Sequence, residues 1–70
     1  MNNKRIVVAL DAMGGDYAPS VVIDGAYIAL LNYKKKDPNF LLEYLIFGDS
    51  DLLTALVDKI PLLKSSSTIV

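Results

Sequence analysis

The sequence IVVALDAMGGD, residues 6–16, joins a run of five apolar residues to a turn that contains two glycines. A strand on the surface of an antiparallel sheet alternates polar and apolar side chains, whereas residues 6–10 are apolar without interruption. Such a run is typical of a parallel strand that is covered on both faces. Asp11 ends the run, and Gly14 and Gly15 favour a tight turn into the next element.

Helical periodicity follows this turn. Apolar residues recur at helical spacing between positions 22 and 31, and Pro19 suits a first helical turn, which predicts a helix over residues 19–33. Three lysines, residues 34–36, complement the carboxyl end of the helix dipole. A second strand is predicted over residues 42–47 because apolar residues return there before a glycine.

A second helix is predicted from Ser50, whose hydroxyl can accept an N–H of the first turn as an N-cap. Its expected buried stripe consists of Leu52, Leu53, Leu56, Val57 and Ile60. Pro61 is expected to end this helix. We interpret the serines at 65–67 as a polar connection and residues 68–70 as the beginning of a third strand.

Strands that alternate with helices predict a parallel sheet with right-handed crossovers. The strand order 3-2-1 would place both helices on one face of the sheet, whereas 2-1-3 would place one helix on each face. Either order leaves apolar strand surface uncovered. The sequence therefore predicts the N-terminal β-α-β-α-β portion of a doubly wound, mainly parallel (Rossmann-like) three-layer sandwich. We interpret residues 1–70 as the truncated N-terminal part of a single α/β domain.

The composition excludes several kinds of function. Eight acidic residues against seven basic ones leave a net charge of −1, without the basic stripe that nucleic-acid binding needs. The chain has no Cys and no His, which removes disulfides, Cys/His zinc sites, thiol nucleophiles and Ser-His-Asp relays. The longest apolar run has six residues, too few for a spanning helix or a secretory signal, so a cytoplasmic location is expected.

Open α/β sheets bind ligands at the carboxyl ends of their strands. Gly14 and Gly15 would let a ligand approach the backbone there, and the helix N-terminus that follows favours a phosphate or carboxylate. Asp11 could hold a donor, a metal-bound water or a neighbouring N–H, and Asp16 could cap the helix. Alternatively, the glycines form only the turn and both aspartates serve only as caps.

The absence of other known motifs argues against some kinds of ligand and reaction at this edge. The dinucleotide fingerprint G-x-G-x-x-G and the P-loop are both absent, which disfavours a nucleotide site. A phosphoaspartate mechanism at Asp11 would need a second Asp where Met13 stands. After the second strand, Gly48 and Asp49 are expected to supply turn and cap chemistry, with ligand contact as the alternative.

The string DAMGGD at residues 11–16, together with Ala18-Pro19, Gly25-Ala26 and Gly48-Asp49, resembles the amino terminus of the bacterial phosphate acyltransferases. These are the acyl-[acyl-carrier-protein]:phosphate transacylases of phospholipid synthesis, and the resemblance spans this chain but only the leading part of a typical member. It implies a cytoplasmic homodimer that makes acyl phosphate from acyl carrier protein thioester and inorganic phosphate, without cofactor or metal. A membrane glycerol-3-phosphate acyltransferase would use the product and bring the enzyme to the membrane periphery.

The same resemblance implies that Asp11, Gly14, Gly15 and Asp16 line the substrate cleft. The N–H groups of the glycines would face the phosphate, with Asp11 as an orienting acceptor and Asp16 as a cap or supporting group; no catalytic residue is assigned. Family members commonly carry His where this chain has Tyr17, so an imidazole that titrates near neutral pH is missing.

We expect this fragment to be inactive by itself. The alternatives are a non-catalytic fragment that only associates with a partner chain and a small binder of phosphate or carboxylate.

Overall fold

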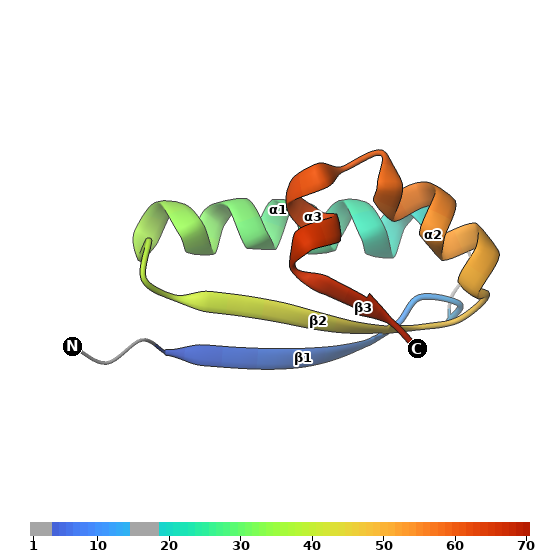
Figure 1. The fold of residues 1–70 in the computed structure, drawn as a ribbon, viewed down its shortest axis with the longest axis horizontal. Helices are drawn as coiled ribbons and strands as arrows, with labels where there is room; N and C mark the ends of the chain where they lie inside the picture. The colour runs from blue at the N-terminus through green and yellow to red at the C-terminus, as the bar shows by residue number, and fades with distance from the viewer. Residues whose placement is uncertain (1–3, 15–18) are drawn as a thin grey trace.

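A computed structural model of the protein describes residues 4–14 and 19–70. Three strands form one parallel sheet in the order β1-β2-β3, which is the 3-2-1 order. The elements are β1 (Arg5–Asp11), α1 (Ser20–Lys36), β2 (Leu41–Phe47), α2 (Ser50–Asp58), α3 (Pro61–Ser65) and β3 (Ser67–Ile69). The β-α-β-α-β order predicted from the sequence is therefore confirmed, with one short additional helix (Figure 1).

All three helices lie on one face of the sheet, as this strand order requires (Figure 1). Alternate residues of β2 point into the helices, so Leu42, Tyr44 and Ile46 are buried. Tyr44 also donates a hydrogen bond of 2.9 Å from its hydroxyl to the carbonyl of Ala26 in α1. The core thus lies between the sheet and the helices, and its further members are Ala12, Ile23, Ala26, Leu30, Leu53, Val57 and Leu63.

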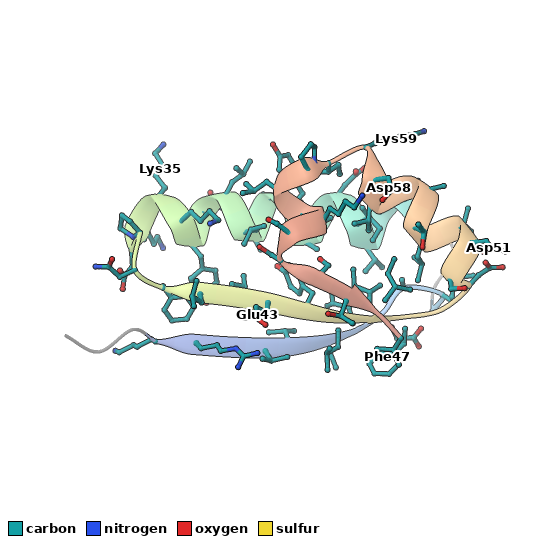
Figure 2. All side chains as sticks on the ribbon, in the orientation of Figure 1. Lys35, Glu43, Phe47, Asp51, Asp58 and Lys59 are labelled. Carbon is teal, nitrogen blue, oxygen red and sulfur yellow. The ribbon has the colours of Figure 1, made fainter. Side chains whose placement is uncertain are left out.

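We call the opposite side of the sheet the bare face. Paired residues of parallel strands share a face, and the register Arg5↔Leu41 places every second residue of β1 and β2 there. Figure 2 shows Phe47 pointing away from the helices on this side. The bare face comprises Arg5, Val7, Ala9, Asp11, Leu41, Glu43, Leu45, Phe47 and Thr68. The sequence predicted that either strand order leaves apolar strand surface uncovered, and the exposure of most of β1 in the described residues confirms this.

Helix α1 is longer than predicted. It continues to Lys36, so the three lysines lie in its last turn. Their positive charge there complements the helix dipole. Pro19 occupies the N-cap position, and its carbonyl accepts the N–H of Ile23 at 3.1 Å. Leu31 belongs to the predicted stripe but is exposed, because it lies to one side of the buried line formed by Ile23, Ala26 and Leu30.

The second helical segment corrects two predictions. The N-cap of α2 is Asp49 rather than Ser50: the Asp49 carboxylate accepts the N–H of Leu52 at 3.1 Å. Helix α2 already ends at Asp58, and Pro61 begins α3 instead of stopping a helix, since the first helical position needs no N–H donor.

Three smaller predictions in this region are also wrong. Leu52, expected in the buried stripe of the second helix, is exposed. Ser65 belongs to α3 rather than to a connection, and Ser67 already belongs to β3.

Candidate functional site

Two turns meet at the carboxyl edge of the sheet. The N–H of Ala12 donates to the carbonyl of Phe47 at 3.0 Å, so the β1–β2 pairing continues into the first turn. The Met13 side chain then packs against Gly48: a Cβ on Gly48 would lie 2.5 Å from Met13 Cγ and 3.1 Å from Leu53 Cδ1. Gly48 also has a φ of 156°, a backbone angle that residues other than glycine rarely adopt. The position therefore requires glycine, and its contact with Met13 joins the two turns.

Asp11 is folded back over the first turn. Its Oδ1 accepts the N–H of Met13 at 3.1 Å, a local turn hydrogen bond. Its Oδ2 lies beside Gly14, where an added Cβ would be only 3.2 Å away. Of the alternatives considered for Asp11, the structure shows contact with a neighbouring N–H. Asp11 and Gly14, both predicted site residues, are thus brought together.

The remaining predicted site residues, Gly15 and Asp16, lie outside the described residues, as does Tyr17. The Gly48-Asp49 pair is described, and Asp49 serves as a helix cap, in agreement with the turn-and-cap interpretation. The sequence placed Gly48 at the edge where α/β sheets bind ligands and predicted a turn residue there. What it did not predict is the contact of Gly48 with Met13.

The charge at this edge is acidic. Asp11 ends β1, Asp49 caps α2 and Asp51 lies in the first turn of α2. The lysines of α1 lie at the far end of the molecule, and Figure 2 shows Lys35 and Asp51 at opposite ends. Among the described residues, no Lys or Arg lies in the turns after β1 or β2. An anion at this edge would depend on backbone N–H groups or on cations from another part of a larger protein.

A separate hollow of about 250 Å³ lies along the carboxyl half of α1 and is lined by Ala29, Asn32, Tyr33 and Lys36. Beside it, the rings of Tyr33 and Phe40 stack with centroids 5.1 Å apart. This end of α1 lies at the amino edge of the sheet, away from Asp11 and Gly14 (Figure 1). The hollow is therefore not part of the site built by the two turns.

Comparison with known proteins finds relatives that share one name. A phosphate acyltransferase from Rhodospirillum centenum is 43% identical over 67 residues, which cover 96% of this chain. The chain matches the amino-terminal part of the phosphate acyltransferase family. The phosphate acyltransferase of Afipia carboxidovorans is 40% identical over 67 residues, again 96% of the chain. That of Rhodopseudomonas palustris strain BisA53 is 41% identical over 70 residues, the whole chain.

The chain spans 17–18% of the length of these phosphate acyltransferases. No family model matches the sequence, and no solved structure matches it. Within residues 4–14 and 19–70, no helix has both the length and the apolar character to cross a bilayer. The family resemblance seen in the sequence is thus confirmed.

Proposed function

We propose that this chain provides the phosphate-side loop of an acyltransferase that moves an acyl group from acyl carrier protein to inorganic phosphate. The observation that carries the proposal is the match of about 40% identity along nearly the whole chain to relatives named phosphate acyltransferase. The placement of Asp11 and Gly14 at the ligand-binding edge of the sheet supports it.

In the proposed reaction, an oxygen of hydrogenphosphate attacks the carbonyl carbon of the thioester. A C–O bond forms, the C–S bond breaks with its electron pair on sulfur, and the phosphate proton ends on the thiol of the carrier protein. Glycine N–H groups would hold the phosphate close to the carbonyl, which lowers the entropy lost in the reaction step. Asp11 would keep the turn in shape through its bond to Met13 N–H.

The acidic edge sets a requirement on this reaction. A phosphate dianion close to Asp11 and Asp49 would be repelled unless a cation lies nearby. The turns after β1 and β2 bring none among the described residues, so the cation must come from the part of the relatives that follows the matched segment. We therefore propose that the present chain alone is inactive. That the complete protein acts as a homodimer in the cytoplasm is a further proposal, which rests only on the family resemblance.

A chimera tests this function. The present chain would replace the matched segment of the Rhodospirillum centenum relative, and acyl phosphate would be trapped with hydroxylamine. We expect the chimera to form acyl phosphate, and Gly14→Val to lower kcat/KM for phosphate at least about tenfold, because the new side chain would displace Asp11 Oδ2.

Gly25→Ala is the matched control, because a Cβ there meets nothing within 4 Å. A chimera that folds but forms no acyl phosphate would contradict the proposed reaction. Unchanged phosphate kinetics in Gly14→Val would remove this turn from the site.

A further inference from the structure

The Met13 side chain reaches from the first turn onto the backbone of the second. Met13 directly precedes Gly14 and Gly15, whose N–H groups would face the phosphate in the proposed function. A Cβ at Gly48 would lie 2.5 Å from Met13 Cγ and 3.0 Å from Met13 Sδ. The thioether therefore occupies the space that glycine, having no Cβ, leaves open at position 48.

The second turn, on which Met13 rests, is anchored in the core. Leu53 borders the same space through its Cδ1, and its side chain is fully buried. The N–H of Leu53 donates to the carbonyl of Asp49 at 2.9 Å, and the Asp49 carboxylate caps the same helix through the N–H of Leu52. The position of the second turn is thus set by α2 and the core, and Met13 ties the first turn to it.

Met13 itself adds little to the core, because its side chain is 46% exposed. Two hydrogen bonds also hold the first turn. The N–H of Ala12 donates to the carbonyl of Phe47 at 3.0 Å, and the N–H of Met13 donates to Asp11 Oδ1 at 3.1 Å. Neither bond involves the side chain of residue 13. A truncation at this position therefore removes the contact between the turns while both hydrogen bonds can still form.

We propose that Met13 is a positioning residue for phosphate: by resting on Gly48, it fixes the first turn so that the N–H groups that follow face the bound ion. An unbranched thioether suits this role because it adapts to an irregular surface. A misplacement of about 1 Å can lower a reaction rate about a hundredfold, so a residue that never touches the substrate can control its use.

The charge of Asp11 makes the position of the turn more important. Asp11 Oδ2 lies beside Gly14, so a negative charge stands within the turn that would hold an anion. A turn that shifts could bring this carboxylate toward the phosphate, and the two would repel each other. The inference about Met13 rests on the proposed function and names a further residue on which phosphate use depends.

Kinetics of the chimera with the Rhodospirillum centenum relative test the proposal. Met13→Ala should raise KM for phosphate at least about tenfold and change KM for the acyl carrier protein thioester less than about twofold. Met13→Leu nearly preserves the side-chain volume and should keep KM for phosphate within about threefold of the parent chimera. Ile28→Ala is the control, because it truncates an apolar side chain that is 58% exposed on α1, and it should change neither KM.

Gly48 supplies a second test. In the parent chimera, Gly48→Ala should raise KM for phosphate at least about tenfold, because the new Cβ would overlap Met13 Cγ. In Met13→Ala the thioether is gone, so the same change at position 48 should add less than about threefold. Effects that simply multiply would show that the two residues act separately, and this result would overturn the proposal.

Hydrogen exchange separates this inference from the proposed function. In Met13→Ala, the N–H of Ala12 should exchange at least about tenfold faster, because the first turn opens more often, while the N–H of Leu53 exchanges as before. A chimera that forms no acyl phosphate contradicts the proposed function, and the exchange at Ala12 then decides alone whether Met13 holds the turn. Unchanged exchange, an unchanged KM for phosphate or an equal rise in both KM values overturns the inference.

Discussion

Gly48 and Met13 are the residues through which the two turns of the candidate site touch. The side chain of Met13 occupies the space where any other residue at position 48 would place its Cβ. The backbone of Gly48 also has a φ that favours glycine. The shape of the first turn therefore depends on a residue in the second, and a substitution at Gly48 would act on Asp11 and Gly14 without touching a substrate.

Gly48→Ala is expected to lower the free energy of unfolding by about 1–3 kcal/mol, because the new Cβ overlaps Met13 and the backbone angle is strained. Urea denaturation followed by circular dichroism would measure this. Gly25→Ala is the control and should raise stability by about 1 kcal/mol, since Gly25 is in a helix interior with open space around it. Equal effects at the two glycines would contradict the contact with Met13.

Tyr44 links the sheet to α1 through its buried hydroxyl. Burial raises the pKa of Tyr44 above its ordinary value, and the neighbouring Tyr33 adds to the shift. Tyr44→Phe removes the hydrogen bond to Ala26 and should cost about 1 kcal/mol.

The raised pKa also fixes the direction of the pH dependence. The neutral phenol is favoured in the folded protein, so its contribution is fully present below the unfolded pKa of about 10 and is lost as the pH rises through the folded pKa. Melting curves at pH 7 to 11 should show a steeper alkaline loss of stability in wild type than in Tyr44→Phe. Parallel pH profiles would contradict this role.

At the scale of elements, the start of α2 shows how a cap is chosen between neighbours. Asp49 and Ser50 both have side chains suited to an N-cap, and only the backbone decides which one reaches the free N–H of Leu52. Asp49 has extended backbone angles and Ser50 is already helical. The carboxylate of Asp49 also faces the positive end of the helix dipole.

Asp49→Ala is expected to destabilise the protein by about 1 kcal/mol, because the N–H of Leu52 loses its partner. Ser50→Ala serves as the matched control and should change the unfolding free energy by less than about 0.5 kcal/mol. Thermal and urea unfolding of both variants would compare them. A larger loss with Ser50→Ala would restore the cap expected from the sequence.

Element types were predictable from the sequence where periodicity was strong. The apolar run before Asp11 indicated β1, and the helical spacing after Pro19 indicated α1. Ends were less predictable, because one residue type can act in two ways. Pro61 can stop a helix or begin one, and the short α3 forms because Leu63 is buried in the core. Such burial is a property of the folded chain and cannot be read from the neighbouring residues in the sequence.

The candidate site was predictable only in part for a similar reason. Asp11 and Gly14 are near neighbours in the sequence, so a local turn could be anticipated. The contact between Met13 and Gly48 joins segments far apart along the chain and depends on β1 lying beside β2. The sequence left the strand order open, because short crossovers allow either order, and the contact could not be derived without it.

At the scale of the whole molecule, the two faces of one sheet differ in their energetic importance. Ile46 is fully buried under the helices, whereas its neighbour Leu45 lies on the bare face. Ile46→Ala should cost about 2–5 kcal/mol, enough to unfold much of so small a protein, while Leu45→Ala should cost about 1 kcal/mol or less. Urea denaturation would measure both. Similar losses at both positions would mean that the isolated chain already covers its bare face.

The free edge of β1 makes aggregation depend on the concentration of this chain in a cell. Its sequence, RIVVALD, is short, rich in β-branched residues and charged only at its two ends, which is the pattern of segments that stack into fibrils. Arg5 and Asp11 are the gatekeepers against such stacking. Copies of the chain that collide before a covering polypeptide has bound would pair through the free edges of their β1 strands. Overproduction should therefore lead to aggregates, and balanced synthesis with a covering polypeptide should prevent them.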